Sequence, residues 1–262
     1  MTGRRPDLSR PLSDRDLQIV QTVAAYRVLS GEQLRRWHFP VLEHGSAAGA
    51  LRRSQRSLHR LVVDGVLATL DRRVGGVRAG SAGYCYVLGY RGQKLVHPTR
   101  RARSAYTFGE RFVAHALATA GITVGLIEAE REGSVEVVEV QPEPDAWRRY
   151  VAGSGAVEVL KPDLFTALGV GDRELRWFVE VDRATESLAR IERKCRQYLT
   201  YLRTGREQER HGVFPRVLWT VPHDKRHQQL LGVMARLPPP ADRLFAVTLH
   251  EHVINELKGG AP

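Results

Sequence analysis

Three acidic residues in the second half of the chain have types and spacing that suit metal-dependent phosphodiester chemistry. Asp163 follows Pro162 at the start of one apolar run, and Glu180 and Asp182 close the next run, beginning seventeen residues later. Acidic residues at the ends of neighbouring strands can converge on a divalent cation, which activates water and offsets charge on a phosphate. Asp163 and Glu180 are therefore the candidate ligands for Mg²⁺ or Mn²⁺.

The strand that carries Glu180 and Asp182 is expected to lie in the middle of a sheet. The run Trp177–Val181 has bulky apolar residues on both faces, which is typical of a buried central strand. Side chains alternate along a strand, so Glu180 and Asp182 share one face. Two acids there are costly without a cation or a basic partner, which favours a functional role.

The same acids also have a purely structural interpretation. Asp163 would then be a turn residue after Pro162, and Glu180 would pair with Arg183 or Arg176. Without the burial argument, the residues give equal weight to the structural and the functional interpretation.

A helix expected from Ser187 to about Arg203 brings a lysine toward these acids. Lys194 borders the apolar stripe of this helix, so we expect it to reach toward the sheet. The stripe consists of Leu188, Ile191, Cys195, Leu199 and Leu202.

The elements around these residues predict an α/β domain with a mixed sheet. Helices are expected at Phe108–Ala120, Ser187–Arg203 and Asp224–Arg236. Strands are expected at Ile122–Ile127, Ser134–Val140, Val157–Leu160, Leu164–Leu168, Trp177–Val181, Arg216–Val221 and Leu244–Leu249.

Positive charge is concentrated at the amino end. Up to Arg103 there are 19 Lys and Arg against 7 Asp and Glu, a balance of +12, whereas the rest of the chain has 21 against 22, a balance of −1. Lysines and arginines that displace phosphate counterions supply sequence-independent affinity for nucleic acid. The asymmetry therefore predicts a polyanionic partner for the first part of the chain.

Three helices and a hairpin are expected in this basic part. The helices are Asp14–Tyr26 with Ser13 as its cap, Ser30–Trp37 with a capping box to Gln33, and Ala47–Val63 ending at Asp64-Gly65. Two strands, Val66–Leu70 and Tyr84–Leu88, bracket a glycine-rich loop that bears Arg72, Arg73 and Arg78. This order predicts a winged helix, whose third helix enters the major groove while the wing touches backbone or minor groove.

The helix Ala47–Val63 has one basic face. Its buried stripe is expected to consist of Leu51, Leu58 and Val62, with Leu61 on the flank. The opposite face carries Arg52, Arg53, Arg56, His59 and Arg60. Solvated helix faces normally mix both signs of charge, so this face favours DNA binding, with arginines suited to either guanine edges or phosphates.

Composition excludes several other classes of protein. Two cysteines, Cys85 and Cys195, are too few for a disulfide scaffold and fit a reducing cytoplasm. The start has no apolar core of a signal peptide, and no run of about 18 apolar residues is evident. Neither GxxxxGK[ST] nor GxGxxG occurs, so a nucleotide-driven motor or a dehydrogenase is unsupported.

The acidic motif resembles that of a nuclease superfamily. Pro162-Asp163 followed by Glu180-x-Asp182 resembles the PD-(D/E)XK nucleases, and LKPDLFTAL with WFVEVDRATESLARIERKCRQYLTYL resembles the replication-relaxation family of plasmids and mobile elements. The resemblance implies an α+β and α/β two-domain protein: a winged helix at 1–97, a basic linker at 98–105 and a PD-(D/E)XK nuclease-like mixed sheet flanked by helices at 106–262. It also implies that Asp163 and Glu180 bind metal and that Glu110 is a third acid.

One departure from the superfamily's pattern affects catalysis. Asp182 stands where the superfamily has a lysine, whose ammonium orients water and stabilises charge on phosphate. Lys194 is the candidate replacement. Two functions therefore stay open, a Mg²⁺-dependent DNA endonuclease or nickase and a non-catalytic accessory factor or transcriptional regulator. Double-stranded DNA is the expected partner, with a homodimer and replication or mobilisation proteins as further candidates.

Overall fold

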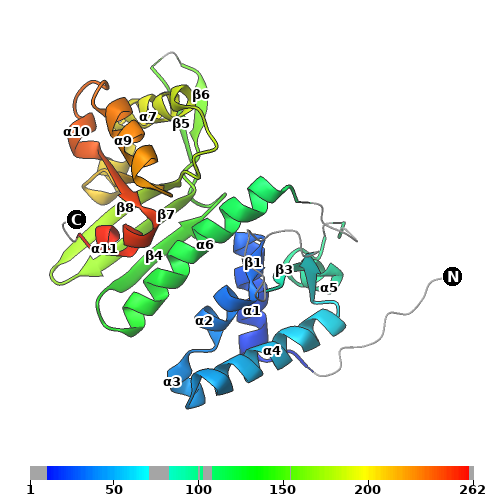
Figure 1. Ribbon diagram of the computed structural model, residues 1–262. Coiled ribbons are helices and arrows are strands. Elements are labelled where there is room, and N and C mark those ends of the chain that lie inside the picture. The colour runs from blue at the N-terminus through cyan, green and yellow to red at the C-terminus, as the bar shows by residue number, and fades with distance from the viewer. Residues whose placement is uncertain (1–10, 71–82, 100, 103–107, 154, 260–262) are drawn as a thin grey trace. The chain divides into compact units, whose positions relative to one another are not determined.

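The computed structural model describes the whole chain except residues 1–10, 71–82, 100, 103–107, 154 and 260–262. Residue contacts divide the chain into two compact units, Met1–Val124 and Gly125–Pro262. Each unit combines helices with β-strands (Figure 1), so the mixed α+β class predicted from the sequence is confirmed.

The first unit contains short helices around a small antiparallel sheet. The three strands lie in the order β1-β3-β2, with Leu29 opposite Tyr86 and Leu67 opposite Leu88. Its elements are α1 (Asp14–Tyr26), β1 (Leu29–Ser30), α2 (Gly31–His38), α3 (Val41–His44), α4 (Ala47–Val63), β2 (Leu67–Leu70), β3 (Cys85–Leu88), α5 (Tyr90–Val96) and the first part of α6 (Glu110–Arg131).

Two serines start the first helices in the way the sequence predicts. The Ser13 hydroxyl accepts the N–H of Asp16, whose carboxylate accepts the N–H of Ser13 at 2.9 Å. Ser30 and Gln33 form the same reciprocal pair at the start of α2, at 3.1 and 3.0 Å. Each capping box satisfies backbone donors that a helix start leaves unpaired, which is why these boundaries are predictable.

The buried stripe of α4 is rotated from the predicted one. The residues that face the core are Ala50, Ser54, Leu58 and Leu61, whereas Leu51 is 45% exposed. Helices α2 and α4 are in contact, and the small side chains of Ala50 and Ser54 permit a close approach. The prediction that Leu51 is buried, which rested on its large apolar side chain, is therefore wrong.

Helix α5 (Tyr90–Val96), which lies just before the linker expected at 98–105, was not predicted from the sequence. Its start at Gly89 has no side-chain cap, so the usual sequence signal is missing. The Gln93 amide instead donates to the Leu88 carbonyl at 3.3 Å. Part of the expected 98–105 linker lies outside the described residues.

Helix α6 replaces two expected elements. The predicted helix Phe108–Ala120 and strand Ile122–Ile127 are one continuous helix, Glu110–Arg131. The alternation after Ala120 resembled a strand, but the helix continues through Gly121 and Gly125, and no proline interrupts it there.

By length and composition, α6 is also apolar enough to cross a membrane, contrary to the sequence expectation. Half of its most apolar stretch is buried, as in the core helix of a globular protein.

The second unit is built on a five-stranded mixed sheet in the order β10-β9-β8-β7-β4. Strand β7 is antiparallel to both of its neighbours, β4 and β8, whereas β8, β9 and β10 are mutually parallel. The elements are β4 (Glu136–Pro142), β5 (Arg148–Val151), β6 (Val157–Leu160), β7 (Leu164–Val170), β8 (Arg173–Val181), α7 (Leu188–Leu202), α8 (Arg206–His211), β9 (Arg216–Val221), α9 (Asp224–Met234), α10 (Ala241–Leu244), β10 (Phe245–Leu249), a 3-10 turn (His250–His252) and α11 (Val253–Leu257).

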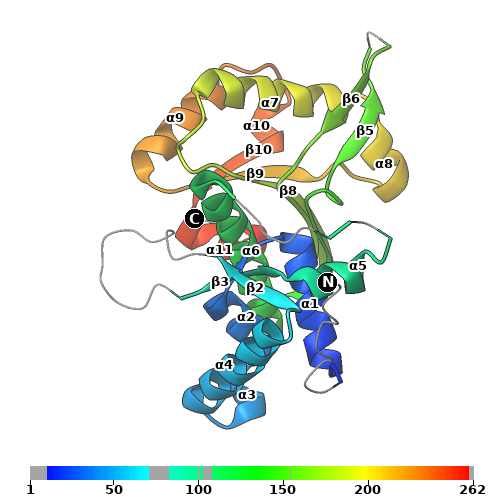
Figure 2. The same cartoon turned by 90° about the vertical axis from the view of Figure 1, so that its right-hand side faces the viewer.

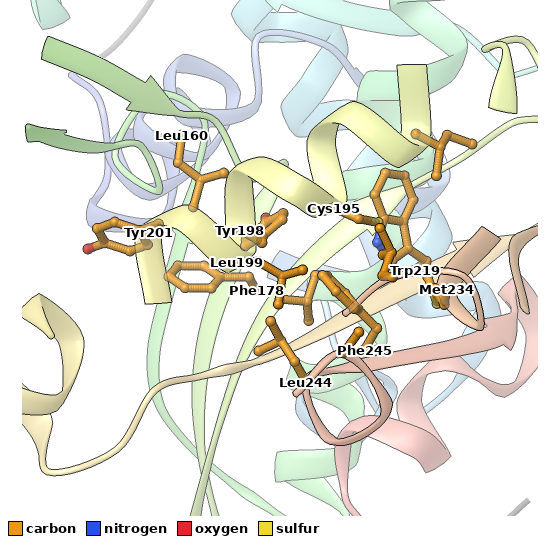
Figure 3. Close-up of a cluster of buried hydrophobic side chains, with 14 of the residues drawn as sticks. Leu160, Phe178, Cys195, Tyr198, Leu199, Tyr201, Trp219, Met234, Leu244 and Phe245 are labelled. Carbon is orange, nitrogen blue, oxygen red and sulfur yellow. The ribbon is translucent and has the colours of Figure 1, made fainter. Parts of the chain in front are cut away.

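Helices α7 and α9 cover one face of this sheet (Figure 2), and β5 and β6 form a separate two-stranded ribbon. The five strands of the mixed sheet, strand β6 and helices α7 and α9 match the sequence expectation within a few residues. The main core lies between α7 and the sheet, where Phe178 and Trp219 meet Tyr198 and Leu199 (Figure 3).

Gly92→Ala is expected to destabilise the first unit. An added Cβ would lie 2.2 Å from the Val66 carbonyl oxygen, so the backbone must shift. Overpacking of this kind costs about 1–3 kcal/mol, which urea unfolding measures. The control is Gly121→Ala in α6, whose Cβ would meet only the Gln33 side chain at 3.6 Å. An equal loss of stability in both variants would contradict the close approach.

Candidate functional site

Glu180 is the most deeply buried of the predicted site acids. It lies near the end of β8 with 1% of its surface exposed, on the same strand face as Phe178, which packs against Tyr198 of α7. The Tyr198 hydroxyl donates to Oε1 of Glu180 at 2.5 Å, and the Lys194 ammonium donates to Oε2. The structure therefore brings Lys194 to the acid, and both oxygens of Glu180 are occupied by donors one helical turn apart.

Burial changes the acidity of this pair. Loss of water, reinforced by the nearby charge of Asp163 and opposed by Lys194, raises the pKa of Glu180 to about 8. Burial alone would lower the pKa of Lys194, but the charges of Glu180 and Asp163 outweigh it and raise that pKa. Lys194 therefore keeps its positive charge at neutral pH, and that charge offsets part of the effect of burial on the pKa of Glu180.

Asp163 connects two strands. It lies just before β7, is 8% exposed, and its Oδ2 accepts the backbone N–H of Val181 at 2.7 Å. This hydrogen bond joins the start of β7 to the end of β8. The contact agrees with the structural interpretation of Asp163 more closely than with a free metal ligand.

Asp182 is held by an arginine that sequence reasoning missed. Arg226 in α9 contacts both carboxylate oxygens, at 2.5 Å (Nε to Oδ2) and 3.3 Å (Nη2 to Oδ1), and also donates to the Glu186 carbonyl. Both side chains are at least nine-tenths buried. Although the sequence grouped Asp182 with the catalytic acids, its oxygens serve a buried ion pair.

The basic side chain that pairs with Glu180 is Lys194. Arg176, one of the two arginines considered for this role, pairs with Glu174 at 2.6 Å. The predicted third acid, Glu110, is exposed at the first turn of α6, in the first unit.

These residues do not fit a Mg²⁺ site. Within the described part of the chain, no group of three or more His, Cys, Asp and Glu residues is placed to hold a metal ion. Metal ligands must be deprotonated and have free lone pairs. Glu180 has a raised pKa and two occupied oxygens, and Asp163 uses one oxygen on backbone.

The basic face of α4 is largely as predicted. Arg52, Arg53, Arg56 and His59 are exposed. Arg60 instead turns toward Asp16 of α1, at 2.6 Å, and toward Asp64 at 3.6 Å, with 14% of its side chain exposed. The wing arginines Arg72, Arg73 and Arg78 lie outside the described residues.

Comparison with known protein families identifies the family to which the chain belongs. The sequence model of the replication-relaxation family matches residues 20–217, from within α1 to the first residues of β9. The chain belongs to the replication-relaxation family. Membership associates it with replication or relaxation of plasmids and mobile elements, and the matched residues span Asp163, Glu180, Lys194 and α4. The curated proteins and the solved structures contain no match to the chain.

The pKa of Glu180 predicts how stability varies with pH. Because the pKa is about 8 in the folded state and 4.5 ordinarily, the folded chain holds a proton that the unfolded chain releases between these values. This contribution is fully present below a pH of about 4.5 and is lost as the pH rises through about 8. We expect Glu180→Gln to remove much of the decline in urea-unfolding free energy across this window.

The control for this measurement is Glu136→Gln, an exposed change on β4 that leaves the buried pair intact. An unchanged pH slope in Glu180→Gln, or an equal change in both variants, would contradict the assignment of the slope to Glu180.

Proposed function

We propose that the protein is a non-catalytic, cytoplasmic DNA-binding factor of plasmid or mobile-element replication, which holds duplex DNA through a winged helix in its first unit. The observation that carries the proposal is the exposed basic face of α4, which contains no acidic residue. The helices and the small antiparallel sheet of this unit follow the chain order expected of a winged helix.

The charge on α4 is available to a partner. Arg52, Arg53, Arg56 and His59 project from about two turns of one helix, and Ala47–Val63 has no carboxylate that would neutralise them. Arginine matches phosphate and guanine edges with two parallel N–H donors. Such a face gives DNA affinity that depends steeply on salt concentration.

The contacts of Glu180 support a binding role over a cleavage role for the second unit. A nuclease of the resembled superfamily needs its acids free for a metal ion, whereas here Lys194 and Tyr198 occupy both oxygens of Glu180. Asp182 is paired with Arg226. In this proposal the mixed sheet is a scaffold in which Asp163 accepts a backbone hydrogen bond and Glu180 and Asp182 contact basic side chains.

Arg52→Ala/Arg56→Ala is expected to weaken DNA binding and flatten its salt dependence. Each lost phosphate contact lowers the slope of log K against log salt by about 1, so the double variant loses about 2. Fluorescence anisotropy with labelled duplex measures this at several salt concentrations. The matched control, Arg190→Ala/Arg196→Ala, removes two exposed arginines from α7. Unchanged affinity in the α4 variant would refute the proposed interface.

Supercoiled plasmid incubated with the protein and Mg²⁺ or Mn²⁺ is expected to stay supercoiled. The reason is that the ammonium of Lys194 and the Tyr198 hydroxyl hold the carboxyl group that a metal would need. Gel electrophoresis measures nicking, with Asp163→Ala/Glu180→Ala as the control for contaminating nuclease. Metal-dependent nicking by the wild type that disappears in the double variant would overturn the non-catalytic role and establish a nuclease.

A further inference from the structure

We propose that a cavity beside α4 binds a phosphate group. The cavity has a volume of about 520 Å³ and is lined by residues of three elements of the first unit: the start of α1, the end of α2 and one side of α4. Four arginines line it, Arg15, Arg53, Arg56 and Arg60. This inference deepens the proposed function where the phosphate belongs to DNA, but the cavity's affinity for phosphate does not depend on that function.

The single acid of the cavity lining is already satisfied. Asp16 accepts the Ser13 N–H at 2.9 Å and the Ser57 hydroxyl at 3.1 Å, and it pairs with Arg60 at 2.6 Å. Burial alone would raise the pKa of Asp16, but the backbone and side-chain hydrogen bonds from Ser13, together with Arg60, lower it. Asp16 therefore stays ionised, and its negative charge is neutralised by the ion pair with Arg60.

Arg15 has a fixed position at the cavity wall. It pairs with Glu43 at 2.7 Å, and its guanidinium lies 5.1 Å from the centre of the Phe39 ring. This ion pair is partly exposed, so water screens it. Arg15 therefore keeps N–H donors and a positive electrostatic potential that an anion can use, although Glu43 offsets part of its charge.

Arg53 and Arg56 supply the positive charge that has no acidic counterpart. They are three residues apart on α4, so their side chains are neighbours. Within the described ranges no carboxylate pairs with either one, and Arg56 Nε only approaches the Arg52 carbonyl at 3.4 Å. Like charges at this spacing repel each other, and an anion placed between them relieves that repulsion.

The chemistry of these donors selects phosphate. Guanidinium groups present planar pairs of N–H donors that match phosphate oxygens. Four arginines against one aspartate give the lining a formal charge of +3. A volume of about 520 Å³ lies in the range of small-ligand sites, so the cavity has room for a phosphate with an attached sugar. The phosphate comes either from the DNA backbone next to α4 or from a free nucleotide.

Calorimetric titration of the full chain with inorganic pyrophosphate, at ionic strength matched with sodium chloride, tests the cavity. Arg53→Gln removes a donor from the lining and is expected to weaken pyrophosphate binding about tenfold or more, as for other charge-assisted hydrogen bonds. The matched control is Arg196→Gln, which changes an exposed arginine of α7 outside the lining and is expected to leave pyrophosphate binding as in the wild type. Absence of pyrophosphate binding, or equal weakening in both variants, would overturn the proposal.

DNA affinity measured with and without pyrophosphate identifies the source of the phosphate. Competition by pyrophosphate, with loss of DNA affinity in Arg53→Gln, supports a backbone phosphate in the cavity. Independent binding of the two, with unchanged DNA affinity in Arg53→Gln, supports a free nucleotide as ligand. If no version of the protein binds DNA while pyrophosphate still binds, the proposed function fails and the cavity stands.

Discussion

The second unit depends on satisfying a carboxyl group that has been removed from water. Glu180 is on a central strand, and an unpaired acid there would cost several kcal/mol. Helix α7 meets this need with Lys194 and Tyr198, which are spaced so that both reach the same side chain. Tyr198 also packs against Phe178 and Phe245. The register of α7 on the sheet is therefore fixed by polar and apolar contacts of the same residues.

Two other buried acids follow the same rule. Asp182 has Arg226, and Glu207 accepts both the Arg148 guanidinium at 3.0 Å and the Tyr201 hydroxyl at 2.5 Å. Replacing buried ion pairs by apolar residues is often neutral or stabilising, so such pairs are weak evidence for stability. In this unit each joins elements distant in the chain, which suits a role in selecting one arrangement of the helices on the sheet.

The sequence predicted those parts of the fold whose signals are local. Ser13 and Ser30 start their helices with capping boxes, and β9 was predicted at its exact bounds because its apolar run ends in Pro222-His223. The errors arose where contacts with residues distant in the chain determine the structure. Examples are the exposed Leu51 and the continuation of α6 as a helix beyond Ala120. In the site, Lys194 was predictable from helical spacing, whereas Arg226 is 44 residues from Asp182 and meets it only through the parallel strand connection.

Helix α6 has a practical consequence for studying the units separately. Its early residue Val113 completes an apolar cluster with Val28, Cys85 and Val87, so a fragment that ended before α6 would leave these side chains in water. A fragment that began at Gly125 would start in mid-helix, without the turns that nucleate it. Any truncation within α6 removes part of this helix from one of the two units. Substitutions on α4 or α7 therefore separate the roles of the two halves more cleanly than truncation does.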